Sequence, residues 1–458
     1  MTGSKAWALL LCWGGVIAAG WPGLPEASAQ EKERSCEGCV RVDAILVEGI
    51  ARTRRAVVER ELTFEEGDVA HPEDLEESAQ RLRNTGLFWT VELEVEAPGL
   101  GGITREAIED VEAADGEPPG RLLRVKVSER WTLAPGFRFG AGGQTFLLSL
   151  GLQDINLGGR YLQAGASYSR LGETNSGSLW FQQPRLFGAR QRLMTEAAYI
   201  NRVHTFYGGE GELLGGYLLT RRRASVQLER EWLIWFRTGA STSVYGDTFS
   251  FDNVDDRRME AQLERAGLPG PMQTVRVGGY GLLGRIDQHR QRYEGTRLGV
   301  HADQFLHFGA EAPRSYRLSA SVRHFTLLPR EANLAVRATI ATSDQEIEHM
   351  QSTAGGLETI RGVPDMRFRG RHMWTSNVEL RIPSLRLAWI TLEHAFFLDA
   401  LGTSRFVETL LRPTAATAGT GIRIYSPQVL ALLVRADVSA PVMGTEGIMF
   451  SFGAGQFF

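Results

Sequence analysis

The chain has 458 residues with a formal net charge of −4, and it holds 52 glycines but only 3 cysteines. The near-neutral charge provides no basic face for nucleic acid, so we expect no nucleic-acid partner. The composition also excludes a disulfide-dense small protein and a disordered chain. No run of about 18 apolar residues follows residue 30, which excludes a bundle of membrane-spanning helices.

The first 29 residues have the pattern of a secretory signal peptide. Lys5 forms a short basic region, residues 6–20 are an apolar core, and residues 27–29 are the small residues that a signal peptidase recognises. A buried core helix is the alternative, but polar residues follow at once. We therefore expect residues 1–29 to be removed and the mature chain to lie in the cell envelope.

Cys36 and Cys39 form a Cys-x-x-Cys motif just before the first expected strand. In an oxidising compartment this spacing favours a local structural disulfide, the alternative being two idle thiols. A redox site would need a strand–helix context, and a zinc site would need two further ligands nearby. Neither is present, so we expect no metal site.

Residues 40–131 read as one small α/β domain of order β-α-α-β-β. The helix expected over residues 71–86 has the clearest boundaries, because Pro72 stands in its first turn and Gly86 at its end. Leu75, Ala79 and Leu82 share one face of this helix, which predicts a core-facing stripe. The other expected elements are strands over residues 40–49, 87–98 and 121–131 and a helix within residues 52–64, with an acidic loop over residues 99–120.

Residues 132–458 alternate apolar and polar side chains with a period of two. Phe146, Leu148 and Leu150 share one face of a segment whose other face carries Ser149 and Gly151. Further segments with this alternation cover residues 224–231, 296–303, 316–324, 333–342, 376–383 and 433–440. Aromatic residues near the ends of the expected strands suggest interface girdles: Trp180, Phe181, Trp232, Trp235, Trp374 and Trp389.

A soluble β-sandwich also alternates, but a second sheet packs its apolar faces. Here a signal peptide precedes the strands, and the apolar faces have few polar breaks. A sheet in hydrocarbon must close on itself, because an open edge would leave backbone groups without hydrogen bonds. We therefore predict a mainly β protein: a transmembrane antiparallel β-barrel of about 16 strands, preceded by one small β-α-α-β-β domain.

The segment 47–49 (VEG) and the segment 84–95 (NTGLFWTVELEV) give the N-terminal domain a resemblance to a POTRA (polypeptide-transport-associated) domain. This resemblance implies a periplasmic domain whose exposed sheet edge pairs with an incoming peptide. An unpaired edge can accept an extra strand in this way. A spacer or a docking domain is the alternative.

Three further stretches resemble the outer-membrane assembly-factor superfamily, which includes BamA/TamA-like bacterial surface antigens and two-partner secretion translocators. The first comprises residues 152–168 and 182–193, the second residues 355–383, and the third residues 395–404, 419–441 and 450–458. Ile360-Arg361-Gly362 matches the hallmark of the family's sixth extracellular loop, which enters the barrel lumen. Val363 stands where the family usually has an aromatic residue.

The resemblance implies that Arg361 pairs with Glu379 and Asp399 and locks the loop inside the lumen. A guanidinium suits this role because it stays charged and presents a planar fork to a carboxylate. The alternative is that Arg361 is a solvated loop charge. The resemblance also implies a sorting signal in Phe450, Phe452 and the terminal Phe458, which are otherwise simply lipid-facing.

The resemblance implies a bacterial outer-membrane protein that inserts proteins into the membrane or translocates them across it. Its partners would be an unfolded envelope or secreted client, outer-membrane lipid and a periplasmic subunit. The sequence has no G-x-S-x-G, H-E-x-x-H or phosphate-binding Gly-Lys motif, so we expect no enzyme activity, catalytic residues or cofactors. The alternative is a structural or passive pore barrel whose periplasmic domain anchors a partner.

Overall fold

The computed structural model describes residues 38–96, 120–142, 145–289, 292–309, 314–356, 359–387, 390–425, 433–445 and 447–454. The predicted signal peptide, Cys36, Trp389 and Phe458 lie outside these residues. No helix in the described part of the chain is long and apolar enough to cross a membrane.

The N-terminal domain is a curled four-stranded sheet with two helices. Its elements are β1 (Val40–Glu48), α2 (Arg55–Glu59), β2 (Val69–Ala70), α3 (Pro72–Asn84), β3 (Phe88–Glu96) and β4 (Gly120–Glu129), with sheet order β2-β1-β4-β3. The expected order is therefore found, with the two-residue strand β2 added. The first helix is shorter than the segment 52–64 because the chain turns after Glu59, which brings Leu62 and Phe64 into the domain core.

Helix α3 follows the expected pattern closely. Pro72 begins it, and the backbone N–H of His71 donates to the Asp74 carboxylate at 3.0 Å as one half of a capping box. Ala79 and Leu82 are buried in the domain core, and Leu75 packs against the same cluster. The apolar stripe thus packs the helix onto the sheet.

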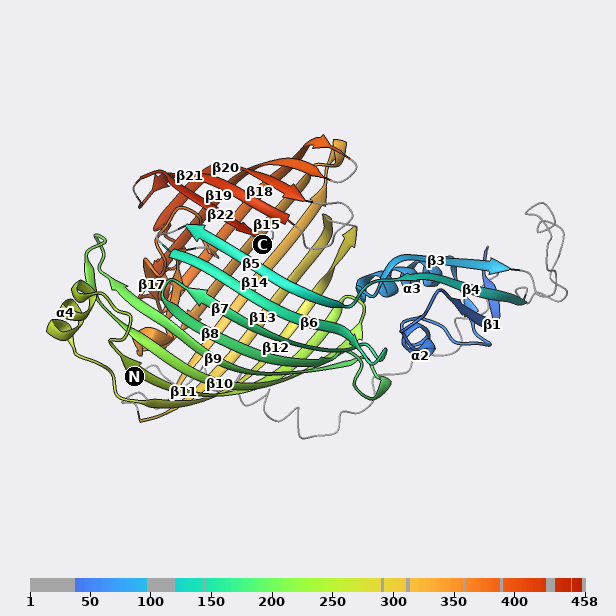
Figure 1. The fold of residues 1–458 in the computed structure, drawn as a ribbon, viewed down its shortest axis with the longest axis horizontal. Coiled ribbons are helices and arrows are strands. Elements are labelled where there is room, and N and C mark those ends of the chain that lie inside the picture. Colours follow the sequence, from blue (N-terminus) through green and yellow to red (C-terminus); the bar gives the residue numbers. More distant parts are fainter. Residues whose placement is uncertain are drawn as a thin grey trace.

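The rest of the described chain forms a closed barrel in which all neighbouring strands are antiparallel (Figure 1). The barrel strands are β5 (Leu133–Gly142), β6 (Thr145–Leu157), β7 (Leu162–Leu171), β8 (Thr174–Gln183), β9 (Gln191–Tyr207), β10 (Leu213–Leu233), β11 (Phe236–Ser250), β12 (Met272–His289), β13 (Arg292–Phe308), β14 (Arg314–Leu327), β15 (Asn333–Ser343), β18 (His372–Arg386), β19 (Thr391–Ser404), β20 (Ala415–Tyr425), β21 (Leu433–Met443) and β22 (Met449–Ala454). These sixteen strands confirm the predicted number, and β22 closes the barrel against β5.

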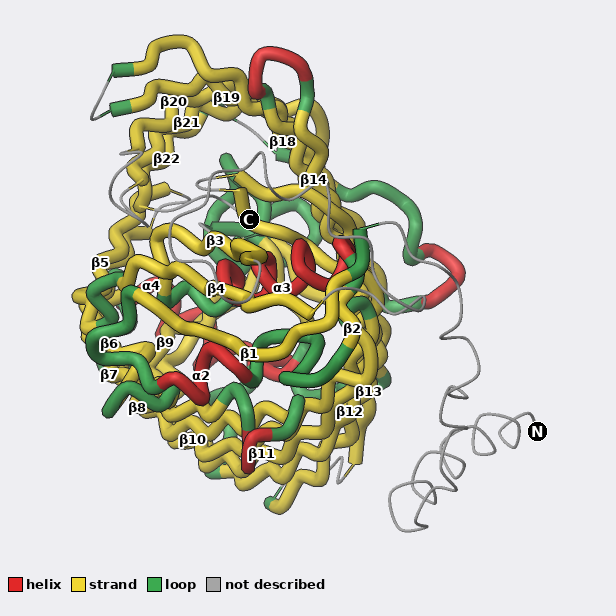
Figure 2. The backbone as a smooth tube through the Cα atoms, turned by 90° about the vertical axis from the view of Figure 1, so that its right-hand side faces the viewer, coloured by secondary structure: helices red, strands yellow, loops and turns green. Residues whose placement is uncertain are grey.

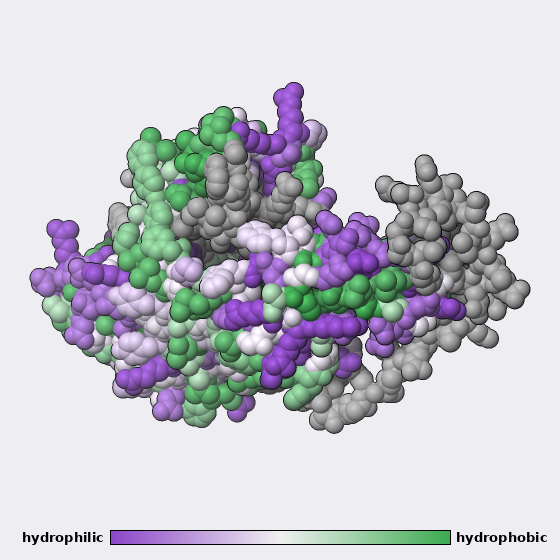
Figure 3. Space-filling view, turned by 45° about the vertical axis from the view of Figure 1, so that its right-hand side comes forward, coloured by the Kyte–Doolittle hydropathy of each residue, from purple (hydrophilic) through white to green (hydrophobic). Residues whose placement is uncertain are grey.

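Short elements occupy the connections. Helix α4 (Asp256–Arg265) lies between β11 and β12, and β16 (Ser352–Ala354) pairs with β17 (Phe368–Gly370) in the segment between β15 and β18. The 3-10 turns are η4 (Leu186–Gly188), η5 (Pro329–Glu331), η6 (Glu348–Met350) and η7 (Val407–Thr409). Hydrophilic side chains gather at the end of the barrel that carries α4, whereas hydrophobic ones cover much of its wall (Figure 3).

The barrel exposes apolar side chains outward and buries polar ones inward. On β13 Leu298 and Val300 are 45% and 60% exposed, whereas Glu379 on β18 and Asp399 on β19 are fully buried. The aromatic residues divide between the two faces. Trp235 is exposed at the turn between β10 and β11, but Trp180 faces the lumen, where it covers Gly165 of β7.

The girdle interpretation was therefore wrong for Trp180. Its neighbour Leu179 is 64% exposed, and successive side chains of a strand point to opposite faces.

Candidate functional site: an arginine held in the barrel lumen

The segment between β15 and β18 folds back into the barrel. Its residues Ile360 and Val363 are fully buried, and they belong to one apolar cluster with Met373 of β18, Leu401 of β19 and Ala415 of β20. One apolar side chain on each side of Arg361-Gly362 thus packs the tip of this loop against the inner wall. We call residues 344–371 the lumen loop.

Arg361 is 1% exposed and binds both carboxylates named from the sequence. Its Nε and Nη2 donate to the two oxygens of Asp399 at 2.8 and 2.9 Å, and its Nη1 donates to Glu379 Oε2 at 2.5 Å. The guanidinium carbon also lies 3.5 Å from the ring centroid of Phe397. The structure therefore brings Arg361, Glu379 and Asp399 together in a bidentate, charge-assisted arrangement.

Three more arginines extend this cluster along the inner wall. Arg381 Nε donates to Glu379 Oε1 at 2.8 Å, and Arg423 lies 3.2 Å from Glu379 Oε2. Arg423 also donates to Asp437 at 2.6 Å, and Arg435 lies 3.4 Å from the other oxygen of Asp437. The alternation places Arg381, Arg435 and Asp437 on a polar face, but sequence reasoning gave them no role and missed Arg423.

We call this set of four arginines and three carboxylates the lumen network: Arg361, Arg381, Arg423, Arg435, Glu379, Asp399 and Asp437. With all groups ionised it carries one net positive charge. Each carboxylate contacts at least one guanidinium. This matters because a buried ion without a partner is strongly destabilising. No cluster of metal-ligating side chains is found among the described residues.

Neutral side chains fix the backbone of the lumen loop beside Arg361. Asn377 donates to Asp399 Oδ1 at 2.9 Å and to the carbonyl of Thr359 at 3.0 Å. Thr417 donates to the carbonyl of Arg361 at 2.8 Å, and the backbone N–H of Arg361 donates to Asp399 at 3.1 Å. The loop is thus held by its main chain as well as by its charge.

Glycine is the residue type that fits position 362. Its φ is +77°, and a Cβ added there would lie 2.3 Å from Ser439 Oγ and 3.0 Å from Ser439 Cβ. A side chain at residue 362 would therefore have to displace β21 or the loop, in addition to the cost of left-handed backbone.

The remaining predicted site residues lie far from the lumen network. Phe450 and Phe452 are 62% and 49% exposed on the outer face of β22. Cys39 is disulfide-bonded, and its Sγ lies 3.1 Å from His71 Nδ1. Its pairing with Cys36, which lies outside the described residues, stays a prediction, as does a sorting role for Phe458.

The N-terminal domain rests across one mouth of the barrel, which sequence reasoning did not reveal. Viewed from the domain side, α2 and α3 lie in front of the ring of barrel strands (Figure 2). Arg52 donates to Asp154 Oδ2 of β6 at 2.7 Å, and Asn156 donates to Thr53 Oγ1 at 2.9 Å. The turn between β6 and β7 adds a backbone bond of 2.9 Å from Arg54 to Gly159.

Helix α3 and the turn that follows α2 are tied to the rim by ion pairs. Glu61, which is 2% exposed, accepts two hydrogen bonds from Arg185 at 2.9 and 2.6 Å. Arg81 of α3 donates to Glu231 of β10 at 2.9 Å, and Glu77 binds Arg285 of β12. These contacts fix the orientation of the domain on the barrel.

Comparison with known proteins agrees with this architecture. Residues 40–129 match the POTRA family, described as "Surface antigen variable number repeat". No curated protein sequence matches the chain.

Among solved structures, BamA from Haemophilus ducreyi lacking POTRA domains 1–3 is similar, with 14% identity and a TM-score of 0.55 over 91% of this chain and 84% of that one. CdiB from Acinetobacter baumannii has 12% identity and a TM-score of 0.55 over 90% of this chain and 74% of that one. CdiB from Escherichia coli has 12% identity and a TM-score of 0.50 over 98% of this chain and 97% of that one. The chain therefore carries a POTRA domain in front of a barrel with the BamA and CdiB fold, which confirms at the level of fold the resemblance to BamA-like surface antigens.

Proposed function

We propose that this chain is a bacterial outer-membrane protein that inserts client proteins into the membrane or translocates them across it, with the POTRA domain in the periplasm. The apolar outer wall of the barrel suits a lipid environment. The POTRA match and the shared fold with BamA and CdiB support a role in protein transport. This placement makes the mouth under the POTRA domain periplasmic and the end with α4 extracellular.

The POTRA domain offers an edge for an unfolded client. Within the described residues β3 pairs on one side only, with β4, so its other side is free to accept an extended peptide. Trp89 on this strand is 49% exposed and stacks with Arg130, which adds an aromatic surface beside the edge. A peptide docked there would lie next to the barrel rim.

The observation that carries the proposal is the closing seam of the barrel. Among the described residues β22 pairs with β5 at two positions. These are Ala141 with Phe452 and Gly140 with Gly453. Gly140 and Gly453 stand opposite each other in this seam, and glycine weakens a strand, so the seam is the place where the strands separate most easily and where a client strand can pair.

A disulfide across the seam tests this proposal. Ala141→Cys and Phe452→Cys stand directly opposite each other on the outer face, so oxidation should close the seam. We expect oxidised protein in vesicles to lose client insertion or passage and to regain it after reduction. The reduced state of the same sample controls for any effect of the substitutions on assembly.

A matched cross-link separates seam opening from general stiffening. Leu150→Cys and Tyr168→Cys stand opposite each other on β6 and β7, also on the outer face. This variant should stay active when oxidised. Full activity of the oxidised Ala141/Phe452 variant would contradict seam opening, and ion conductance without any client transport would favour the passive pore. Deletion of Phe458 should lower outer-membrane yield if the C-terminus is a sorting signal.

A further inference from the structure

The outer wall of the barrel is hollowed over β7 to β11. A hollow of about 970 Å³ covers this region, and a second one of about 520 Å³ adjoins it on β8 to β11. Small outward residues, Gly177, Ala197 and Ala224, form the floor. Leu179 and Val244, which are 64% and 53% exposed, rise on either side. We call this continuous depression the outer furrow.

Strand pairing divides the wall around the furrow into three successive rows of outward side chains. The first row is apolar and joins Ala166, Leu179, Ala197, Ala224 and Val244. The second row joins Tyr168, Gly177, Tyr199, Arg222 and Gly246. The third row, closest to the hairpin between β7 and β8, is polar and includes Asn175, Asn201, Thr220 and Thr248.

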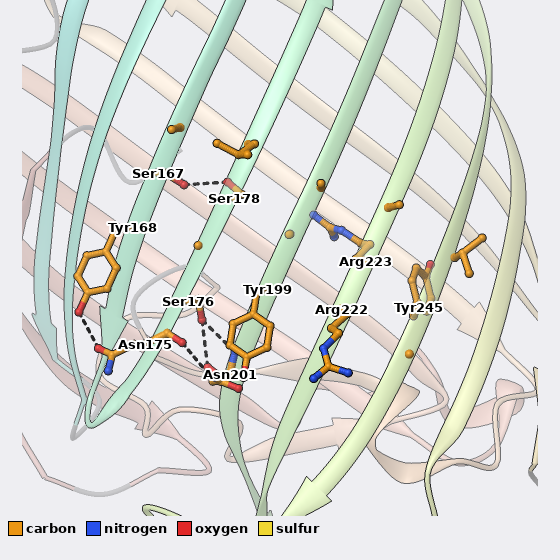
Figure 4. A pocket seen from close by; sticks show the side chains of 18 of the residues that line it. Ser167, Tyr168, Asn175, Ser176, Ser178, Tyr199, Asn201, Arg222, Arg223 and Tyr245 are labelled. Atoms are coloured by element: carbon orange, nitrogen blue, oxygen red, sulfur yellow. Dashed lines mark hydrogen bonds between the residues drawn. The ribbon is translucent and has the colours of Figure 1, made fainter.

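The second row therefore marks the boundary between the hydrocarbon and the headgroups at the extracellular side. Two tyrosines in this row fit that depth, because aromatic side chains with a polar tip favour the membrane interface. Tyr168, Asn175, Tyr199 and Arg222 gather at one end of the hollow (Figure 4). The furrow thus has a polar end and a long apolar floor.

Arg222 is the outward-facing cation that lines the hollow at this polar end, whereas the exposed Arg170, opposite Asn175 in the third row, donates to the carbonyl of Gly172 and does not line the hollow. Arg222 is exposed, and no hydrogen bond or ion pair joins it to another residue of the described chain. Its neighbours point to the lumen and are paired there: Arg221 binds Asp247 at 2.7 Å, and Arg223 binds Glu196 at 2.7 Å. A lipid-facing arginine is costly unless it meets a counter-charge or water at the interface.

We propose that the outer furrow binds an anionic lipid of the outer leaflet, with its phosphate on Arg222 and one acyl chain along Ala197 and Ala224. The guanidinium suits a phosphate because it can donate two parallel hydrogen bonds. The floor of small residues leaves room for a chain between the ridges of Leu179 and Val244. This inference rests on the proposed membrane placement and makes no use of client transport.

The test measures lipid binding by native mass spectrometry of the full mature protein, released from detergent with defined lipids. The probes are phosphatidylglycerol, diphosphorylated lipid A and a diacylglycerol with the same acyl chains. We expect the phosphate lipids to bind and diacylglycerol to bind at least tenfold more weakly, since charge-assisted hydrogen bonds are worth about 1.5–3 kcal/mol. Arg222→Gln should lower phosphate-lipid binding by roughly tenfold, and Arg222→Lys by less.

Two more variants locate the site. Ala224→Leu fills the furrow without changing charge and should also weaken binding. Arg230→Gln is the matched control, because Arg230 is exposed at the other end of the same strand, where it stacks on Trp232. It should bind lipid like the unchanged protein.

An equal loss of phosphate-lipid binding in Arg222→Gln and Arg230→Gln would overturn the proposal, because it would indicate non-specific attraction of the lipid to any surface arginine. Unchanged binding in Ala224→Leu, or full displacement of lipid by inorganic phosphate, would exclude a role for the furrow. Heat-modified mobility in gels verifies folding of each variant. Whether the protein needs detergent during purification tests the proposed membrane placement independently of lipid binding.

Discussion

Removal of the Arg361 side chain should release the lumen loop while leaving the barrel closed. In Arg361→Ala, Glu379 keeps Arg381 and Arg423 as partners. Asp399, however, keeps only the amide of Asn377 among its side-chain partners in the described chain. The loss therefore leaves one buried carboxylate without a cation. Breaking a buried pair by removing one partner costs about 3–5 kcal/mol.

This energy sets the size of the expected effect. Since about 1.4 kcal/mol is a factor of ten, the loop should open roughly 100- to 5000-fold more often. Hydrogen exchange read by mass spectrometry at Gly356 and over residues 359–364 measures that opening directly. The amides of Arg361 and Gly356, which bond to Asp399 and to the carbonyl of Val363, should lose protection by this factor.

A control lies on the same loop. Arg202 donates to both oxygens of Asp365 at 2.9 and 3.0 Å, but both side chains are partly exposed. Such a pair is worth about 0.2–1 kcal/mol, so Arg202→Ala should raise exchange by less than about sixfold. Arg361→Met combined with Asp399→Asn should recover part of the lost protection. Exchange in Arg361→Ala within threefold of the unchanged protein, or equal to that of Arg202→Ala, would refute the reasoning.

Three further predictions concern the loop and the POTRA contacts. Gly362→Ala should lower the temperature at which the heat-modified gel band is lost, because the new Cβ meets Ser439, and Ser439→Gly should relieve only the steric part. Arg185→Ala leaves Glu61 buried without its bidentate partner and should loosen the contact of the POTRA domain with the barrel by about 3–5 kcal/mol. The measurement is faster protease cleavage at residues 130–132, between β4 and β5, at unchanged barrel stability. Burial raises the pKa of Glu129, but hydrogen bonds from Thr53 and from the backbone N–H groups of Arg52 and Thr53 outweigh it, so the net pKa is lowered. The contribution of Glu129 to POTRA stability is therefore present above the usual glutamate pKa of about 4.3 and is lost as the pH falls through the lowered pKa. Glu129→Gln should remove this acid dependence of thermal unfolding. A pH profile identical to that of the unchanged protein would contradict the prediction.

The alternation of side chains, together with the signal-peptide pattern, predicted the barrel, and the alternation also predicted the side of each strand on which most charges lie. Period-two patterning specifies a face, because one residue more or less reverses every side chain. That is why Glu379 could be assigned to the polar face of its strand, whereas the lumen position of Asp399 followed from the family resemblance. The core stripe of α3 was correct because Leu75, Ala79 and Leu82 follow the helical period instead. Trp180 was misplaced because its aromatic character was weighed above its position in the strand.

The contacts that could not be predicted from the sequence depend on which segments become neighbours and, for strands, on their register. Glu61 and Arg185 lie far apart in the sequence, and no periodicity links a turn of the POTRA domain to a turn of the barrel rim. Arg423 of β20 reaches Asp437 on the neighbouring β21 and Glu379 on β18, across β19, because these four strands pair at one particular register. Strand stagger around a closed barrel determines such a meeting, and the stagger is a property of the whole ring.

The position of the lumen network divides the barrel into two mechanically unequal parts. Apart from Arg361 of the lumen loop, its side chains come from β18, β19, β20 and β21, so ion pairs stiffen the wall on one flank of the seam. The POTRA domain instead grips β6, the turn after it, β10 and β12, on the opposite flank. A force on the POTRA domain would therefore act on the flank of the seam that contains β6, while the ion pairs among β18 to β21 hold the other flank.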